Sequence, residues 1–368
     1  MTKSLFRNAV LAAAVAGLGL SPAAAQDAAR PAKPAAAARK PAGIADQANK
    51  VTGTEINDAQ RKAVDRGLAW LAKRQGASDN FAQGGYSNHA GITALAGIAF
   101  MQAGNLPNRG RYGKEVQNVL DYVLANCSRS GLITSDNSSS PMYGHGFATL
   151  FLGEVYGMTP TEEVKEKLQR AVGLIQKTQN AEGGWRYQPA PFDADISVTI
   201  AQIMALRAAR DAGIKVEKDV IDKAVAYCRR CQNADGGFNY MANGVGGSAF
   251  PRSAAGVSAL YYAGIFEGDE LTRGLNYIKQ FTPGRGSRNN EGHYFYGQYY
   301  AVQANFLAGG EYWANWYPAV RNELCASQQQ DGSWTGDFSE DYATSMALIV
   351  LQMPNRYLPV YAGKGPGS

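Results

Sequence analysis

The chain has 368 residues, of which 36 are Lys or Arg and 31 are Asp or Glu, and its formal net charge is +5. Lys3 and Arg7 supply two of these charges and residues 26–50 supply a net three, so residues 51–368 are neutral overall. A nucleic-acid-binding function loses its main support, because the basic balance does not belong to the part of the chain expected to fold.

Residues 1–25 have the pattern of a secretory signal peptide. Lys3 and Arg7 form a positive start, Ala9–Leu20 is a short apolar run, and Ala23–Ala25 offers a small-residue cleavage site before Gln26. The run is too short to span a membrane comfortably, so an uncleaved anchor is the weaker interpretation. We expect a periplasmic or secreted protein with no transmembrane segment in the mature chain.

Residues 26–55 are predicted to form a disordered linker, because Ala, Pro, Lys, Arg and Gln dominate and little there can bury a core. The positive charge of the linker leaves a weak attraction to an acidic envelope surface open. The folded part is expected at 56–356, and residues 357–368 are expected to form a C-terminal tail that runs over the surface.

One short motif recurs through the folded part: Gln, two spacers, an acid, Gly, Gly or Ser, and then an aromatic residue. It is clearest at 179–185, 232–238 and 328–334, and weaker copies begin at Gln75 and Cys127. The starts at 75, 127, 179 and 232 are 52, 52 and 53 residues apart, and steps of 49 and 47 complete the series. A near-constant period of this size indicates a repeat architecture.

The chemistry of the motif predicts a staple between neighbouring helices. Its Gln and its acid can bond backbone groups at a helix end, its glycines allow a positive φ, and its aromatic ring can pack onto the next helix. This structural interpretation is favoured over a catalytic one.

Each repeat predicts two helices of different character. The first is amphipathic, with a solvated face, and the predicted ranges are Asp58–Arg74, Lys114–Asn126, Thr161–Thr178, Glu217–Cys231, Asp269–Gln280 and Tyr317–Ser327. The second is apolar on most sides and rich in small residues, which predicts burial, and the ranges are Gly91–Ala103, Gly146–Tyr156, Ser197–Ala212, Ser253–Ala263, Gly297–Ala308 and Tyr342–Gln352.

Residues 328–334 resemble the QW motif of squalene–hopene cyclases, oxidosqualene cyclases and, more loosely, protein prenyltransferase β-subunits. The resemblance extends over residues 58–355, because the motif recurs in register. It implies an all-α fold, an α/α toroid of six helical hairpins with an inner helix ring inside an outer one. The reaction has to be argued from the site rather than from this fold.

Such a ring is expected to leave a funnel at the end where the inner helices begin, and ligand sites are typically concave with few polar groups. The segments that lead into the inner helices carry all three histidines of the chain. These imidazoles, with carboxylates, a guanidinium and tyrosines, suit acid–base work or metal binding, whereas the alternative is that they cap helices and bond loops. The candidate residues are Tyr86, Asn88, His89, Tyr143, His145, Asp193, Asp195, Arg252, His293, Tyr294, Tyr296, Gln298, Asp341 and Tyr342.

Residues 192–199 are similar to the Asp-x-Asp-Asp-Thr motif of squalene–hopene cyclases, in which the middle aspartate protonates a terminal alkene. By position, Asp193 matches the first acid, Asp195 the middle one and Ser197 the threonine. Ile196 stands where the last acid is expected, so the motif is incomplete and alkene protonation loses one of its supporting groups. A helix cap is the alternative role for Asp195 or Ser197.

The candidate residues divide into two predicted roles. The predicted catalytic residues are Asp195, Asp193, His293 and His145. The predicted substrate-binding residues are His89, Tyr143, Arg252, Tyr296, Gln298, Asp341 and Tyr342.

Prenyltransferase β-subunits hold zinc with Asp, Cys and His and need a helical partner subunit. No Asp-x-Cys precedes an inner helix here, and no cysteine falls among the candidate residues. No metal site is predicted, although zinc held by histidines and aspartates such as His293 and Asp195 stays open. The cofactor and the oligomeric state are left open as well.

The chain has four cysteines, Cys127, Cys228, Cys231 and Cys325. An even number in an exported protein suggests disulfides. Cys228 and Cys231 have the spacing of a redox or metal pair, but no second pair and no thioredoxin-like strand pattern accompanies them. A structural disulfide or two free thiols is favoured over redox catalysis.

Two classes of function follow. The first is an exported enzyme that acts on a lipid or isoprenoid in the funnel, or on a polysaccharide. The second is a non-catalytic protein that binds an apolar or sugar-like small molecule, or that has a structural role in the envelope. An enzyme should lose turnover but keep much of its binding when Asp195 or His293 is replaced, whereas a binder should depend mainly on aromatics such as Tyr296 and Tyr342.

Overall fold

The structure is a computed structural model that describes residues 55–75, 81, 89–135, 139–284 and 292–361. All of them belong to the larger compact unit of the chain, Lys40–Ser368. The predicted signal peptide, nearly all of the predicted linker, and Tyr86 and Asn88 lie outside the described residues. Within the described ranges, none of the helices combines the length and the apolar character needed to cross a membrane.

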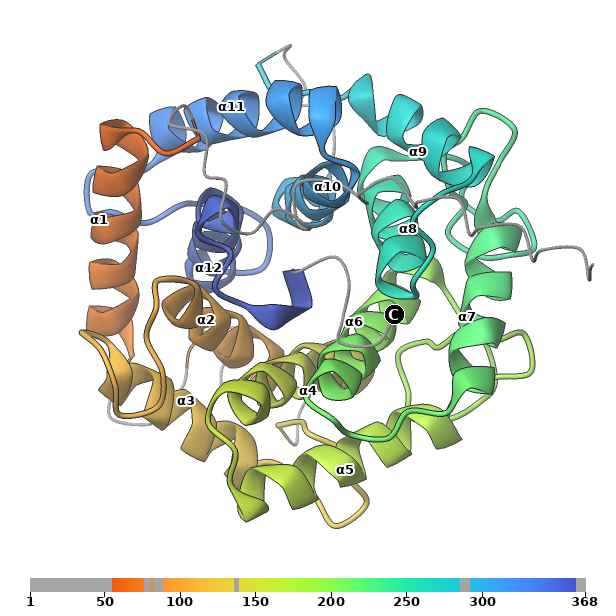
Figure 1. Cartoon of the computed structure of the whole chain (residues 1–368), viewed down its shortest axis with the longest axis horizontal. Helices are drawn as coiled ribbons and strands as arrows, with labels where there is room; N and C mark the ends of the chain where they lie inside the picture. Colours follow the sequence, from red (N-terminus) through yellow and green to blue (C-terminus); the bar gives the residue numbers. More distant parts are fainter. Residues whose placement is uncertain (1–54, 76–80, 82–88, 136–138, 285–291, 362–368) are drawn as a thin grey trace, which may run out of the picture. The chain divides into compact units, whose positions relative to one another are not determined.

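The described part of this unit is helical and forms two concentric rings (Figure 1). The outer ring consists of α1 (Asp58–Arg74), α3 (Gly113–Ala125), α5 (Glu162–Lys177), α7 (Lys218–Cys231), α9 (Asp269–Lys279) and α11 (Gly310–Ser327). The inner ring consists of α2 (Ala90–Gln102), α4 (Pro141–Met158), α6 (Ile196–Asp211), α8 (Phe250–Tyr262), α10 (Tyr294–Ala308) and α12 (Glu340–Leu351).

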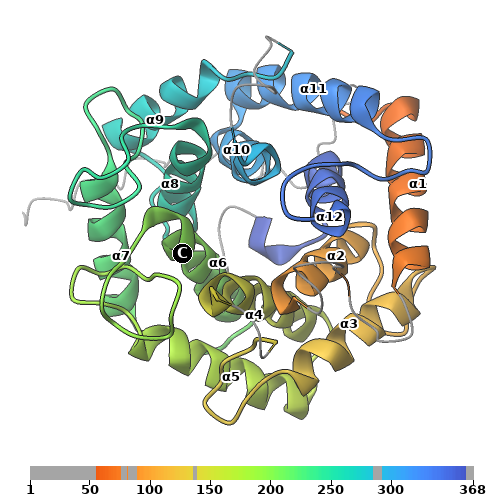
Figure 2. The same ribbon diagram turned by 180° about the vertical axis from the view of Figure 1, so that it is seen from behind.

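The inner ring is closed on itself. Each inner helix packs against the next one along the chain, and α12 packs against α2. The outer helices surround this ring in both views (Figures 1 and 2). The predicted all-α toroid of paired inner and outer helices is confirmed.

Four helices begin three or more residues earlier than the sequence pattern predicts. α4 begins at Pro141, α8 at Phe250, α10 at Tyr294 and α11 at Gly310. Pro141 occupies the first turn, where a missing N–H costs nothing, so the apolar pattern after it understates the length of the helix. Tyr143 and His145 therefore lie inside the first turns of α4 rather than in the loop before it.

The two rings differ in how much of each helix they bury. Every residue of α2 is buried, as expected for a helix that is surrounded by others. In α5 the buried residues form one stripe, namely Val164, Leu168, Ala171, Val172 and Ile175. The rest of α5 faces outward, because its charged residues occupy the opposite side.

The repeated glutamine joins each repeat to the next outer helix. In three copies of the motif the side-chain amide donates to a backbone carbonyl of the following outer helix at 2.8 Å. These pairs are Gln179 with Val220 on α7, Gln232 with Glu270 on α9, and Gln328 with Ala63 on α1. The last pair connects the end of the chain to its beginning and closes the outer ring.

A glycine in each of these copies lies against the same outer helix. Gly183, Gly236 and Gly332 have φ of +96°, +88° and +100°. A Cβ at Gly183 would stand 2.2 Å from the carbonyl oxygen of Lys223, three residues beyond the carbonyl that Gln179 bonds. The motif therefore needs glycine here for two reasons, the left-handed backbone and the close approach to a helix carbonyl.

The aromatic residue of the motif ties its loop to the preceding outer helix. The indole N–H of Trp185 donates to the carbonyl of Ile175 on α5 at 2.7 Å, and that of Trp334 donates to Leu324 on α11 at 2.9 Å. Both rings are fully buried. Each repeat thus anchors its loop to the preceding outer helix and to the following one.

The C-terminal end of the described chain lies across the middle of the ring, on the side where the inner helices end. Two short helices, η4 (Met353–Asn355) and η5 (Pro359–Tyr361), pack against α4, α6, α10 and α12 (Figures 1 and 2). Leu358, Val360 and Tyr361 are buried. The ordered ring therefore includes five residues that the sequence assigns to a surface tail.

The buried carboxyl of Glu154 on α4 holds this segment. Its Oε1 accepts the backbone N–H of Val360 at 3.2 Å. Burial raises the pKa of Glu154 to about 8, the bond from Val360 and the Arg207 guanidinium lower it, and the Asp211 carboxylate raises it further. Glu154 is therefore protonated in the folded protein at neutral pH.

We predict that Gly183→Ala destabilises the protein more than Gly213→Ala does. Gly213 also has a left-handed backbone, with φ +86°, but a Cβ there meets nothing within 4 Å. Gly213→Ala should cost about 1–2 kcal/mol from the backbone alone, and Gly183→Ala should cost at least about 1 kcal/mol more, because it also overpacks. Urea unfolding of both variants measures the difference, and equal losses would remove the close-approach argument.

We predict that Glu154→Gln stabilises the protein increasingly as the pH rises. The unfolded carboxyl ionises near its ordinary pKa of 4.5 while the folded one stays protonated up to about 8, so the wild type loses stability between these values. The advantage of the variant should widen by up to about 1.4 kcal/mol per pH unit. Urea unfolding at pH 5, 6.5 and 8 measures it, with Glu163→Gln on the exposed face of α5 as the control. Parallel stability curves would contradict the assignment.

Candidate functional site

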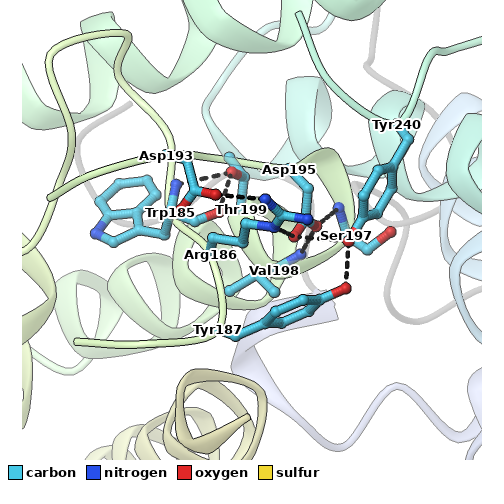
Figure 3. Close-up of polar contacts among 9 residues, drawn as sticks. All are labelled: Trp185, Arg186, Tyr187, Asp193, Asp195, Ser197, Val198, Thr199 and Tyr240. Atoms are coloured by element: carbon cyan, nitrogen blue, oxygen red, sulfur yellow. Dashed lines mark hydrogen bonds and ion pairs between the residues drawn. The ribbon is translucent and has the colours of Figure 1, made fainter. Parts of the chain in front are cut away.

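Asp195 is the N-cap residue of α6 and is fully buried. Its Oδ1 accepts the backbone N–H groups of Ser197 at 2.9 Å and Val198 at 2.8 Å (Figure 3). Its own N–H donates to the carbonyl of Trp185 at 3.0 Å, so the motif loop fixes where the cap sits. One carboxylate oxygen thus performs the helix-capping role that was the alternative prediction for Asp195.

The second oxygen of Asp195 faces a different set of groups. Tyr240 donates its hydroxyl to Oδ2 at 3.1 Å, and Nε of Arg186 lies 3.7 Å from the same oxygen. Tyr187 and Tyr240 share a hydrogen bond between their hydroxyls. Because Tyr240 gives its only hydrogen to Asp195, Tyr187 is the donor of that pair. A chain of hydrogen bonds therefore runs from Tyr187 through Tyr240 to the buried carboxyl (Figure 3).

Burial raises the pKa of Asp195 to about 6. The N–H of Val198, the hydroxyl of Tyr240, the N–H of Ser197 and the charge of Arg186 each act in the opposite direction and limit the rise. The carboxyl is therefore held where both protonation states are accessible near physiological pH, which suits a general acid or base.

Arg186 connects Asp195 to the surface. Its guanidinium bonds Asp193, which is exposed, and lies over the rings of Tyr187 and Tyr240 at 5.1 and 5.8 Å. The bond to Asp193 is the largest cause that raises the pKa of Arg186, so this cation stays charged. A permanent positive charge therefore stands beside the oxygen of Asp195 that is not used for capping.

Two predicted residues from other inner helices approach the same place. Tyr296 on α10 donates its hydroxyl to the backbone carbonyl of Ser197 at 3.2 Å. The ring of Tyr143 on α4 lies 6.1 Å from that of Tyr187. Burial raises the pKa of Tyr143 well above its usual value, and the Asp195 carboxyl adds to the rise. The structure thus brings together four of the predicted site residues, Asp193, Asp195, Tyr143 and Tyr296.

His145 has the same contact that four other inner helices make with Thr or Ser. In each, a side chain in the first or second turn accepts the backbone N–H at the aromatic position of the motif, at 2.9–3.2 Å. The acceptor–donor pairs are Thr93 with Phe81, His145 with Ile133, Thr199 with Trp185, Ser253 with Phe238 and Thr344 with Trp334. Burial lowers the pKa of His145 to about 4, so this imidazole is neutral and acts as a structural acceptor through Nδ1.

Three further predicted residues bond parts of the scaffold. His89 caps α2 by accepting the N–H of Ile92 at 3.4 Å, and burial lowers its pKa. Arg252 lies in the first turn of α8 and bonds carbonyls of the preceding loop, at Gly246 and Gly247. Asp341 is fully buried, and Nε of Arg74 on α1 lies 3.2 Å from its Oδ1. These contacts fit the interpretation that such residues cap helices and bond loops.

His293 and Tyr342 lie where the chain enters α10 and α12. His293 is exposed, has φ +63°, and stacks on Phe338 with ring centroids 5.8 Å apart. Phe338 meets Tyr342 edge to face at 5.2 Å, while Tyr294 donates to Glu323 on α11 at 2.5 Å. Gln298 is buried on α10, and its Oε1 has no hydrogen-bond partner among the described residues. The contacts of these four residues do not reach Asp195.

Sequence reasoning missed Arg186, Tyr187 and Tyr240. A signal for the two tyrosines exists, because each stands two residues after the aromatic of its motif, at Trp185 and Phe238. Aligning consecutive repeats beyond the motif would have found this shared position. Which carboxyl they serve depends on the fold, since Tyr240 belongs to the next repeat along the ring from Asp195.

The described residues give no metal centre. Within these ranges, no three His, Cys, Asp or Glu side chains are grouped so that they could hold a metal ion. All four cysteines are free thiols, and Cys228 and Cys231 are buried in α7. Burial raises the pKa of Cys231 to about 12, so its reactive thiolate form is disfavoured.

Comparison with known proteins supports the fold. The family model of the squalene-hopene cyclase C-terminal domain matches residues 145–301. No curated protein sequence gave a significant match. The similarity to cyclase-type α/α toroids that the motif predicts is confirmed.

Solved structures with this fold include enzymes of different reactions. The type II terpene cyclase MstE from Scytonema is 13% identical, with a TM-score of 0.58 over 82% of this chain and 100% of that one. An aspartate-to-asparagine variant of it, bound to its substrate geranylgeranyl dihydroxybenzoate, is 12% identical, with a TM-score of 0.54 over 82% and 97%. An inactive α-1,6-mannanase variant from Salegentibacter sp. HEL1_6, bound to α-1,6-mannotriose, is 10% identical, with a TM-score of 0.61 over 81% and 99%.

We predict that Tyr240→Phe raises the pKa of Asp195. The hydroxyl of Tyr240 donates to Oδ2 and favours the ionised carboxylate, so its loss favours the protonated form. Titration of the ¹³C-labelled carboxyl by NMR measures the shift. Tyr112→Phe, which removes a buried hydroxyl at the start of α3, is the control and should leave the titration unchanged. An unchanged or lowered pKa in Tyr240→Phe would contradict the geometry.

Proposed function

We propose that the protein is an exported enzyme that uses Asp195 as a general acid on a lipid of isoprenoid type. The observation that supports the proposal is that the two carboxyl oxygens of Asp195 have different partners. One oxygen is occupied by the capping N–H groups, and the other faces Tyr240 and Arg186. A side chain that only capped α6 would not need the second set.

Tyr240 and Arg186 compensate for the missing acid of the Asp-x-Asp-Asp-Thr pattern. When Asp195 gives up its proton, the negative charge is received by two backbone N–H groups, the Tyr240 hydroxyl and the Arg186 guanidinium. These groups are in place before the reaction, so little reorganisation is needed. The burial that raises the pKa keeps the proton available until substrate arrives.

The hydrogen-bond chain gives the proton a path. Asp195 is fully buried, whereas Tyr187 at the other end of the chain is partly exposed. When Oδ2 carries the proton, the chain is reversed, so Oδ2 donates to Tyr240, Tyr240 donates to Tyr187, and Tyr187 donates to a substrate atom. Each group then passes its own proton one step outward, the substrate atom receives that of Tyr187, and the ionised Asp195 is left accepting from Tyr240 as in the structure. The reverse shift returns a proton from solvent and restores the acid. No oxidant or metal is required for this exchange.

The lining favours an unsaturated, uncharged substrate. The aromatic rings of Tyr143, Tyr187, Tyr240 and Tyr296 surround the carboxyl, and aromatic faces stabilise positive charge that develops on carbon. A terpene cyclase with this fold binds geranylgeranyl dihydroxybenzoate, an isoprenoid with an oxygenated head group. Because residues 1–25 have a signal-peptide pattern, the substrate is expected to be a lipid available outside the cytosol.

A second candidate function is action on a polysaccharide. A mannanase variant with this fold binds α-1,6-mannotriose, and tyrosines suit sugar rings as well as isoprenoid chains. Two carboxylates at a fixed separation are needed for glycoside hydrolysis. Asp193 and Asp195 are the two carboxylates of this site, and Arg186 lies against both. A non-catalytic lipid- or sugar-binding protein is the outcome if neither substrate class is turned over.

We predict that Asp195→Asn abolishes turnover without unfolding the protein. Asparagine caps helices as well as aspartate does, so α6 keeps its bonds to Ser197 and Val198. Turnover should fall by about 10²–10⁴-fold, the usual contribution of a general acid. Mass-spectrometric assays on geranylgeranyl lipids and on α-1,6-manno-oligosaccharides, run in parallel, identify the substrate class.

The matched control is Asp222→Asn, which changes an exposed carboxylate on α7 that pairs with Lys218. It should leave turnover unchanged. In the wild type, kcat/KM should stay level below pH 6 and fall about tenfold per pH unit above it, because only the protonated Asp195 acts. Full activity in Asp195→Asn, or activity that rises above pH 6, would reject the proposed role.

A further inference from the structure

A buried phenol inside the inner ring has no hydrogen-bond partner among the described residues. Tyr300 on α10 is fully buried, and its hydroxyl is one of the polar atoms left unpaired there. The rings of Tyr296 and Tyr299 each lie 4.8 Å from the Tyr300 ring, edge to face. An unpaired buried hydroxyl is costly in a folded protein and needs a reason.

Tyr300 points into the interior of the ring rather than toward the outer helices. Burial raises its pKa well above the usual value, and the phenols of Tyr299, Tyr143, Tyr342 and Tyr262 add to the rise because they lie near it. Three of those phenols belong to α4, α12 and α8, helices on different sides of the inner ring (Figure 1). Only a side chain inside the ring can be near all three.

Tyr300 is connected to the surroundings of Asp195 through Tyr296, whose ring it contacts. Tyr296, one turn earlier on the same face of α10, reaches the carbonyl of Ser197 beside Asp195. Tyr143 and Tyr296 are partly exposed, whereas Tyr300 is fully buried, so exposure falls from the mouth of the ring toward its centre. Phe147 on α4 and Tyr299 on α10 meet with ring centroids 5.9 Å apart, and the Tyr299 ring also contacts that of Tyr300. Side chains from α4 and α10 therefore pack together beside Tyr300.

We propose that Tyr300 is the inner contact of the same ligand site and binds an oxygen atom in the head group of the lipid. This inference rests on the proposed function. The lipid chain would lie against Tyr143 and Tyr296 after these partly exposed side chains shift, with its reacting end near the Asp195 chain of hydrogen bonds. A phenol both donates and accepts, so a hydroxyl or a carbonyl oxygen satisfies it. A hydrocarbon leaves it unpaired, and the site thereby selects oxygen-bearing lipids over hydrocarbons of the same length.

The test compares two probes on Tyr300→Phe in the mature chain, namely geranylgeraniol and the corresponding hydrocarbon without the hydroxyl group. Titration calorimetry should show that the wild type binds the alcohol more tightly. Tyr300→Phe should bind the alcohol about tenfold more weakly than the wild type does, which is the effect of losing one good hydrogen bond. Its affinity for the hydrocarbon should be unchanged. Its thermal unfolding temperature should not fall, because the substitution removes an unpaired buried hydroxyl and no contact.

Tyr112→Phe, which removes another unpaired buried hydroxyl far along the chain, is the control and should bind both probes like the wild type. The assignment would be overturned if the wild type bound the two probes equally or bound neither. It would also be overturned if Tyr300→Phe lost the same affinity for both probes. Failure of the proposed function is distinguishable, because Asp195→Asn would then keep its turnover while the preference for the alcohol persisted.

Discussion

The ring depends on one contact, the bond from a motif glutamine to a backbone carbonyl of the next outer helix. Gln179, Gln232 and Gln328 make it at the same distance, and a glycine with positive φ in each copy lies against a second carbonyl three residues further on. Both groups contacted on the outer helix are backbone carbonyls, so the contact does not depend on which side chains that helix carries. The same staple can therefore be repeated around the ring although the outer helices differ in sequence.

Because the staples hold the scaffold, the loops at the start of the inner helices are free to differ. The repeated scaffold contacts account for His145, which occupies the place of a threonine or serine in other repeats. Asp195 is different, since only its capping contacts belong to the helix start. Its remaining partners, Arg186, Tyr187 and Tyr240, form an arrangement added to one part of an otherwise repetitive molecule. In a repeat protein, a functional site is expected where one repeat has contacts that the other repeats lack.

Opposing electrostatic effects act on Asp195. Burial favours the neutral carboxyl, while the helix N–H groups, a phenol and a guanidinium favour the carboxylate. The two effects partly cancel, so the pKa is raised only to about 6. The same ring buries Glu154 with a single backbone donor, and there burial dominates, with a pKa of about 8. The number of donors aimed at each carboxyl separates the two cases.

The period of about 52 residues and the alternation of amphipathic and apolar segments were enough to predict the paired helices, most of them within a few residues. The closed ring was what the resemblance to squalene–hopene cyclases implied. Asp195 could be identified as a candidate catalytic residue from its position just before an inner helix. The sequence alone could not show that Tyr240 and Arg186 meet at this carboxyl, that His145 serves the scaffold, or that Tyr300 is left unpaired inside the ring. Helices follow from patterns within a few turns of chain, whereas Tyr240 meets Asp195 from 45 positions away and Tyr296 meets Ser197 from 99 positions away. Only closure of the ring brings such residues together, because it decides which side chains of distant helices share one interior.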